Sequence, residues 1–205
     1  QYADIVMLRT HAHKNVLEFS KYLDIPIING LTDLSYPCHI MSDIMTFEEL
    51  KGPIKNKKIA WLGDGNNIVY SLIEAAVQFD FELRIASPKG YEPNSKILDL
   101  TKDFVTITNS KKSALAGANI VTTDVWTSMN SSSQSKDKEI LFKDCFVDPK
   151  AMEISKKDSI FLHCLPAHRG EEISYDMLDH PSSKVWIQAE NRMHIQEAIL
   201  DFLLN

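Results

Sequence analysis

The sequence predicts an α/β protein built from doubly wound parallel sheets. Strand-like and helix-like segments alternate along almost all of the 205 residues. This alternation is typical of a parallel sheet covered by helices on both faces. Several strand-like runs, such as residues 159–162, are short and continuously apolar, as expected for strands buried on both sides. The length allows a substantial core and indicates one or two domains.

The first part of the chain predicts a small strand–helix unit. Its expected strands are residues 5–8 and 25–28, and its expected helices are residues 14–23 and 37–50. Gly52-Pro53, followed by lysines, is the best candidate for a domain boundary. We therefore expect a first domain over residues 1–51.

A second series of strands and helices follows, and we expect it to form a domain over residues 52–188. The expected strands are 58–62, 82–86, 105–108, 119–123, 159–162 and 184–187. The expected helices are 68–79, 95–103, 111–116, 139–146, 151–154 and 174–178. A polar loop is expected over residues 128–138, and loops of this length are usually functional or disordered. The last segment, residues 189–205, is predicted to be an amphipathic helix that packs back toward the first domain.

Composition argues against several kinds of partner. The formal net charge of −6 and the pI near 5.6 supply no broad basic face for nucleic acid. No apolar run approaches the roughly 20 residues that span a bilayer, so no membrane segment is expected. Cys38, Cys145 and Cys164 are widely spaced, which gives neither a disulfide framework nor a zinc pattern and suits a reducing compartment. The sequence therefore predicts a cytoplasmic protein.

Polar and reactive residues follow directly after predicted strands. His163-Cys164-Leu165-Pro166 comes after the run 159–162, and Asp124 comes after the run 119–123. Because the carboxyl ends of parallel strands meet at the edge where open α/β sheets bind ligands, we expect these groups to line one cleft. Taken alone, each segment has a simpler explanation, namely a strand end with a buried cysteine or a helix cap made by Asp124 or Ser128.

The glycines of Gly63-Asp64-Gly65-Asn66-Asn67 suggest a tight strand-to-helix turn. A nicotinamide dinucleotide site wants a third glycine, where this sequence has Ile68, and an acidic residue after the next strand, which here ends in Ala86-Ser87-Pro88. A nicotinamide oxidoreductase is therefore improbable. A plain turn with Asn66 or Asn67 at the helix start remains open.

Two arginines and one helix start are candidates for binding an anion. Arg9 ends the first predicted strand, and Arg192 lies in the last predicted helix. Each could fork onto a phosphate, although a surface ion pair is the commoner fate of such an arginine. Tyr36-Pro37 precedes a helix whose first backbone amides could contribute to the same site.

Taken together and in order, these segments resemble the ornithine carbamoyltransferases over essentially the whole chain. The matching segments are Asn29-Gly30-Leu31-Thr32-Asp33-Leu34, Trp61-Leu62-Gly63-Asp64-Gly65-Asn66-Asn67, Pro88-Lys89-Gly90-Tyr91-Glu92-Pro93, Asp124-Val125-Trp126-Thr127-Ser128-Met129, His163-Cys164-Leu165-Pro166 and Ala189-Glu190-Asn191-Arg192.

The resemblance implies a two-domain subunit, a homotrimer, and transfer of the carbamoyl group of carbamoyl phosphate to the side-chain amine of L-ornithine, without metal or organic cofactor. It implies that Asn67, Asp124, Ser128 and Met129 hold ornithine, with Cys164 and Asp124 near the attacking amine. The resemblance further implies that Cys164 and Leu165 offer carbonyls to the carbamoyl group. Arg9 and Arg192 would hold phosphate and stabilise charge in the transition state. Cys164, Asp124 and Arg192 would thus be the catalytic residues, and the loop 128–138 is expected to close over the substrates.

The sequence departs from the family pattern at three places. A Ser-x-Arg-Thr-Arg phosphate-binding segment has no counterpart and would precede Gln1, so we expect a fragment that lacks part of its first domain. Tyr36 and His39 stand where the family has the His and Gln of its carbamoyl-binding segment, and Asn130 replaces a glycine.

These departures keep alternatives open. An ornithine carbamoyltransferase with impaired activity is the leading hypothesis. A sister carbamoyltransferase would act on another amine, such as putrescine. A non-catalytic paralogue or fragment would keep the fold and bind ornithine or a partner subunit.

Overall fold

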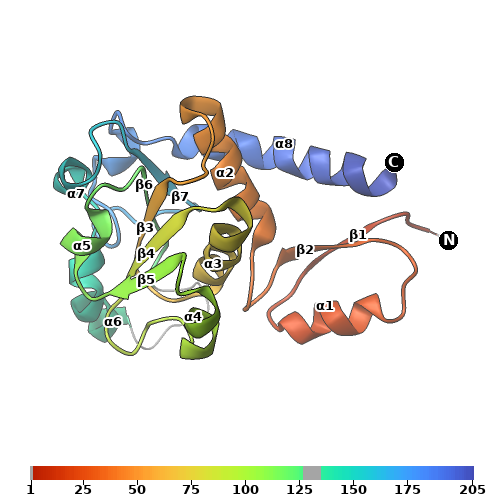
Figure 1. Cartoon of the computed structure of the whole chain (residues 1–205). Coiled ribbons are helices and arrows are strands. Elements are labelled where there is room, and N and C mark those ends of the chain that lie inside the picture. Colours follow the sequence, from red (N-terminus) through yellow and green to blue (C-terminus); the bar gives the residue numbers. More distant parts are fainter. Residues whose placement is uncertain (1, 127–134) are drawn as a thin grey trace.

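A computed structural model of the chain describes residues 2–126 and 135–205. Within this part, the strands form two parallel sheets, one of two strands and one of five. Helices cover both faces of the larger sheet, and the smaller sheet lies beside it near the N-terminus (Figure 1). The structure therefore confirms the predicted α/β class with parallel sheets.

The smaller sheet is a single strand–helix–strand unit. Strand β1 (Val6–Arg9) pairs in parallel with β2 (Ile27–Leu31), and α1 (His13–Ser20) connects them. Helix α2 (Pro37–Lys51) follows and leads into the larger sheet. Met7 of β1 and Leu17 and Phe19 of α1 are exposed, because this unit has too few elements to cover its own apolar surface.

The larger sheet has the strand order β5-β4-β3-β6-β7, and all its neighbouring strands are parallel. Its strands are β3 (Lys58–Leu62), β4 (Glu82–Ala86), β5 (Val105–Thr108), β6 (Ile120–Thr123) and β7 (Ile160–His163).

Side chains alternate between the two faces of this sheet and build a core on each. Along β3, Ile59 and Trp61 join the core that includes α3 (Asn67–Phe79) and α2. Ala60 and Leu62 join the opposite core, which includes α5 (Lys111–Leu115) and α7 (Pro149–Ile154). Burial on both faces explains why residues 59–62 of β3 are continuously apolar in sequence.

The strand order reverses beside β3. The chain runs outward from β3 to β4 and β5, then returns to the other side of β3 for β6 and β7. The carboxyl ends of β3 and β6 therefore flank the point where the order reverses, and open α/β sheets bind ligands in the crevice at such a point. The turn after β3 and Asp124 after β6 both lie there.

Short helices complete the layer around the larger sheet, namely α4 (Ser95–Thr101), α6 (Ser135–Phe142) and single 3₁₀ turns at Lys143–Cys145 and Met177–Asp179. Two of these four elements differ from the prediction. Because α6 begins at Ser135, the expected loop 128–138 is wrong over its last residues. The expected helix 174–178 is replaced by the second 3₁₀ turn.

The last helix, α8 (Val185–Leu204), begins earlier than the sequence indicates. The expected strand 184–187 is wrong. The amide of Phe161 in β7 donates to Ser182 O and its carbonyl accepts from Lys184 N, so pairing with β7 ends before Val185. The β-branched residues that suggest a strand instead form the first helical turn, because tertiary packing overrides local propensity.

Helix α8 packs along α2, and both lie on the same side of the larger sheet (Figure 1). Ser42 Oγ donates to Gln188 O at 2.8 Å, and Asn191 Nδ2 donates to Thr46 Oγ1 at 3.0 Å. In the described part of the chain, no helix is both long enough and apolar enough to cross a membrane.

Candidate active site

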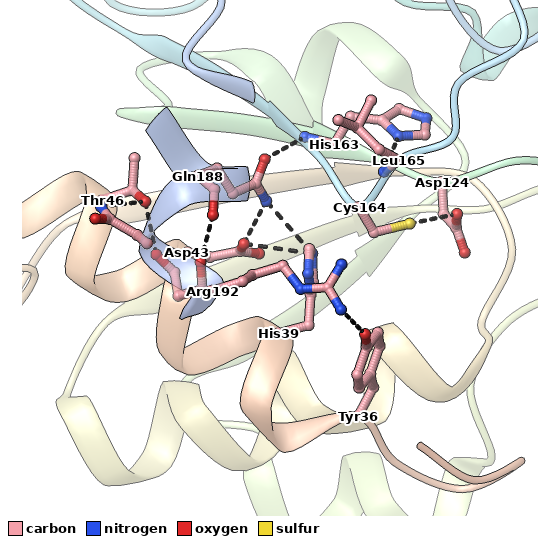
Figure 2. A network of polar contacts seen from close by, with 12 residues as sticks. Tyr36, His39, Asp43, Thr46, Asp124, His163, Cys164, Leu165, Gln188 and Arg192 are labelled. Atoms are coloured by element: carbon pink, nitrogen blue, oxygen red, sulfur yellow. Dashed lines mark hydrogen bonds and ion pairs between the residues drawn. The ribbon is translucent and has the colours of Figure 1, made fainter. Parts of the chain in front are cut away.

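Two side chains meet at the carboxyl ends of neighbouring strands. Thr123 of β6 pairs with His163 of β7, so Asp124 and Cys164 follow at the same level. Cys164 Sγ lies 2.7 Å from Asp124 Oδ1, as Figure 2 shows. The structure thus joins two residues that are 40 positions apart in the sequence, as predicted from their places after apolar runs.

The thiol of this pair is the neutral partner. Burial raises the pKa of the Cys164 thiol well above its ordinary value, and the negative charge of Asp124 and the hydrogen bond to it raise that pKa further. The thiol therefore donates its hydrogen, and the negative charge of the pair stays on the Asp124 carboxylate. A carboxylate in this position can accept hydrogen bonds from an amine and can stabilise a positive charge that develops on the amine nitrogen.

A third strand end contributes an amide to the same carboxylate. Asn66 Nδ2 donates to Asp124 Oδ2 at 2.9 Å, while Asn66 Oδ1 caps α3 by accepting from Ile68 N at 3.0 Å. The adjacent Asn67 instead donates to Thr32 O at 2.7 Å. The sequence singled out Asn67 for ornithine; the structure gives the contact with Asp124 to Asn66 and makes Asn67 a link to the turn after β2.

The glycine turn after β3 is shaped by protein packing. A Cβ atom on Gly65 would lie 2.6 Å from Pro93 N and 2.7 Å from Tyr91 O, so only glycine fits. Gly65 N also donates to Tyr91 O at 2.7 Å. The backbone of residues 91–93 thus fills the space beside Gly65 that a dinucleotide site would leave for pyrophosphate, in agreement with the missing third glycine.

A second group of polar residues lies between α2 and α8. The Arg192 guanidinium donates to Tyr36 Oη and lies 5.4 Å from the centre of the Tyr36 ring (Figure 2). Tyr36 is buried, whereas Arg192 is partly exposed. Tyr36 and Arg192, both predicted for the carbamoyl-phosphate site, are therefore together, but the phenol oxygen already takes one N–H group of the guanidinium.

His39 lies beside Tyr36 in the protein core. The two rings stack with centroids 5.4 Å apart, and His39 Nε2 lies 3.3 Å from Asp43 Oδ1. Burial lowers the pKa of His39 to about 3, and the nearby Arg192 and His163 lower it further. His39 is thus a neutral, buried ring whose Nε2 faces Asp43.

Asp43 and Gln188 were not identified from the sequence. Burial raises the pKa of Asp43 to about 8. Gln188 Nε2 donates to Asp43 Oδ1, and Gln188 Oε1 accepts from the His163 backbone N–H at 3.1 Å (Figure 2). One signal was available: Gln188 lies four positions before Arg192, so both fall on one face of α8.

Leu165 completes the turn after β7 with an unusual backbone. Its φ of +47° is in the left-handed region that bulky residues rarely adopt. Its N–H donates to His163 Nδ1 at 3.0 Å. Such conformations persist where surrounding contacts impose them, often at ligand sites.

The structure leaves one predicted site residue, Arg9, outside this arrangement. Arg9 ends β1 with an exposed side chain, and no hydrogen bond or ion pair within residues 2–126 and 135–205 joins it to Cys164 or Arg192. Ser128 and Met129 lie outside the described residues. Lys138, the last residue of the predicted loop 128–138, lies in α6, and its Nζ is 2.7 Å from Asp64 Oδ2.

Family models match both parts of the chain. The model described as "Aspartate/ornithine carbamoyltransferase, Asp/Orn binding domain" covers residues 55–203, and the one described as "Aspartate/ornithine carbamoyltransferase, carbamoyl-P binding domain" covers residues 1–49. The chain therefore belongs to the aspartate/ornithine carbamoyltransferase family.

Similar proteins are ornithine carbamoyltransferases. The chain is 51% identical over 201 residues to "Ornithine carbamoyltransferase 1, anabolic" of Pseudomonas savastanoi pv. phaseolicola, covering 98% of this chain and 66% of that protein. It is 46% identical, with the same coverage, to "Ornithine carbamoyltransferase, anabolic" of Pseudomonas aeruginosa. The chain thus spans about two thirds of the length of these relatives.

Solved structures agree with this assignment. The ornithine carbamoyltransferase from Pyrococcus furiosus superimposes with a TM-score of 0.93 at 38% identity, covering 99% of this chain and 67% of that one. The enzyme from Burkholderia thailandensis gives a TM-score of 0.91 at 40% identity, covering 99% and 66%.

Proposed function

We propose that this chain is the larger part of an ornithine carbamoyltransferase. The reaction transfers the carbamoyl group of carbamoyl phosphate to the side-chain amine of L-ornithine, giving citrulline and phosphate. The amine attacks the carbamoyl carbon, a C–N bond forms, and the C–O bond to phosphate breaks. The anabolic names of its relatives support a place in arginine biosynthesis.

The observation that carries this proposal is the contact of Cys164 and Asp124 at the edge of the larger sheet. An attacking amine becomes positively charged as the C–N bond forms. A partly buried carboxylate held by Asn66 and by a neutral thiol is placed to stabilise that charge without reorganising. In this proposal Asn67, Ser128 and Met129 complete the ornithine site.

Arg192 is proposed to bind the phosphate side of the first substrate. Its guanidinium can fork onto phosphate oxygens and neutralise the charge of the leaving group. Leu165 and Cys164 would offer carbonyl oxygens to the carbamoyl NH₂, and Arg9, Tyr36 and His39 belong to the same proposed site.

The proposal also covers the domain organisation and the assembly of the protein. Residues 1–51 would be the remainder of the carbamoyl-phosphate domain, and residues 52–188 the ornithine domain. The helix at 189–205 would return to the first domain, as the contacts of α8 with α2 support. The complete protein would be a cytoplasmic homotrimer.

A second candidate function has a specific observation in its favour. Tyr36 Oη accepts from Arg192, and His39 is a buried neutral ring with Nε2 facing Asp43. Carbamoyl phosphate would have to displace or share these contacts. A non-catalytic member that keeps the fold and binds ornithine or a partner subunit is consistent with this arrangement.

A citrulline assay separates the two functions. The chain would be compared with a version joined to the N-terminal third of a relative, and with that version carrying Tyr36→His and His39→Gln. We expect citrulline from the joined, doubly substituted version and much less from the chain alone. Adding Asp124→Asn should lower kcat/KM by on the order of a hundredfold or more.

Each outcome of this assay decides between the candidates. Citrulline from the joined version without the two substitutions eliminates the non-catalytic function. Citrulline formed only after the two substitutions favours the non-catalytic function for the natural sequence. No citrulline from any version refutes the enzyme proposal. Asp103→Asn, a change at an exposed carboxylate after α4, serves as the matched control for Asp124→Asn.

A further inference from the structure

A compact group of metal-ligating side chains lies in the segment after β7, beyond the proposed active site. His168 offers a ring nitrogen, and Glu171 and Glu172 each offer a carboxylate oxygen. These three atoms all lie within 4.8 Å of one another. The proposed transfer reaction uses none of these residues, so their arrangement needs another explanation.

Glu172 is the member whose burial is hardest to explain without a ligand. Its side chain is fully buried, and its Oε1 accepts from the His168 backbone N–H at 2.5 Å. Its second oxygen, Oε2, is also buried and has no hydrogen-bond partner among the described residues. A buried carboxylate oxygen without a partner is strongly unfavourable, because it has given up water and received nothing in exchange.

His163 supports this carboxylate from the other side. His163 Nδ1 accepts from Leu165 N, so the ring hydrogen of the neutral imidazole must be on Nε2. That nitrogen lies 3.3 Å from Glu172 Oε1. Nε2 and Oε1 are close without meeting hydrogen-bond geometry, so the His163 ring limits where the carboxylate can lie and leaves Oε2 as the free ligand atom.

His168 and Glu171 face the same point from the solvent side. His168 Nδ1 is buried without a hydrogen-bond partner in the described part of the chain and lies 3.3 Å from Glu171 Oε2. Ligands about 2.0 to 2.1 Å from a tetrahedral zinc ion are separated by about 3.3 to 3.4 Å, which matches this spacing. The two side chains are about 40% exposed, at 42% and 40%, so an ion has a path of entry.

We propose that His168 Nδ1, Glu171 Oε2 and Glu172 Oε2 bind one divalent transition-metal cation of the zinc class, with water in the fourth position. One imidazole and two carboxylates suit Zn²⁺ better than Mg²⁺, which prefers oxygen ligands and retains its water. Two negative charges are neutralised by the ion, including the buried one. Through Glu172 and His163, the ion would stabilise the turn that carries Cys164 and Leu165.

Calorimetric titration of the metal-free chain with Zn²⁺ tests this site. We expect one ion per chain, no binding of Mg²⁺ at the same concentrations, and at least tenfold weaker Zn²⁺ binding in His168→Ala and in Glu171→Gln. His194→Ala removes an exposed imidazole from α8 and should leave the affinity unchanged. These substitutions are at partly exposed positions and should leave the fold intact, which circular dichroism spectra of the variants can check.

The Cys164 thiol is a competing zinc ligand, and a second measurement separates it. Cys164→Ser should keep the affinity, and Co²⁺ bound to the chain should show tetrahedral absorption without the charge-transfer band of a thiolate. Loss of binding in Cys164→Ser, equal affinity in His168→Ala, or no binding to the parent chain would each overturn the proposal. None of these readouts depends on carbamoyl transfer, so the site can fail while the proposed function stands, and the reverse.

Discussion

Replacing Asp43 by asparagine is expected to remove a specific pH dependence from the stability of this protein. Asp43 is fully buried between α2 and α8, where it faces His39 and Gln188, with Arg192 and His163 as the nearby charged or titratable groups. Burial raises its pKa to about 8. The folded protein thus keeps a proton on Asp43 at pH values where the unfolded chain has lost it.

The direction of the effect follows from the protons bound in each state. The stability that Asp43 contributes is complete below its unfolded pKa, about 3.9, and is lost as pH rises through about 8. His39 acts oppositely: its folded pKa is about 3, so its contribution is complete above about 6.5 and is lost as pH falls. Between about pH 4 and 6.5 the two effects cancel, because each state binds one proton on this pair.

The magnitude is largest between about pH 6.5 and 8. There only the Asp43 proton distinguishes the two states, so the free energy of unfolding should fall by about 1.4 kcal/mol per pH unit, or about 2 kcal/mol in all. Asp43→Asn cannot titrate and should lose this decline. Asp103→Asn, at an exposed position, should keep it.

Urea unfolding at the two ends of this pH range measures the difference, with the fluorescence of the buried Trp61 as one probe. The parent chain and Asp103→Asn should lose about 2 kcal/mol of unfolding free energy between about pH 6.5 and 8, and Asp43→Asn much less. An equal decline in Asp43→Asn, or a flat profile in the parent, would refute the assignment of a neutral Asp43.

Two further substitutions test the remaining contacts. Gln188→Ala removes the partner of two buried groups, the His163 backbone N–H and the Asp43 carboxyl, so the free energy of unfolding should fall by about 2 to 6 kcal/mol. Gln78→Ala, at an exposed position of α3, should change the free energy of unfolding by less than about 0.5 kcal/mol. Similar midpoints of urea unfolding for the two variants would contradict the network. Asp124→Asn removes a charge that raises the pKa of Cys164, so site-resolved alkylation by iodoacetamide near neutral pH should become faster at Cys164 and remain slow at the buried Cys145; an unchanged rate at Cys164 would contradict the contact.

The sequence predicts the larger sheet well because its strands carry a strong local signal. The strands around Trp61 and Phe161 are continuously apolar, and both are buried on two faces. The approach of Asp124 to Cys164 also follows from sequence order alone, since strand ends at one edge of a parallel sheet are brought together by topology.

Other features depend on packing that the sequence does not display locally. Val185 and Ile187 have strand propensity, yet the last pairing with β7 ends at Lys184 and the chain turns into α8. The choice between Asn66 and Asn67 as partner of Asp124 depends on the rotation of a single helix start.

The buried network between α2 and α8 was the feature that the sequence predicted least. An aspartate within a helical segment usually faces water, and nothing in the local pattern marks Asp43 as buried. Its environment is created by Gln188, which lies 145 positions later in the chain. Only the tertiary structure reveals that the two side chains meet.

The pairing of α2 with α8 has a consequence for biosynthesis. Ser42 and Gln188 are 146 positions apart, so the surface of α8 against which α2 packs is synthesised long after α2 itself. Until then, the side of α2 that carries Ser42 and Thr46 lacks its partner, and native contacts between distant segments are slow to form. We therefore expect a nascent chain that stops before α8 to be a good substrate for chaperones and proteases, because the polar side of α2 is uncovered until α8 is made.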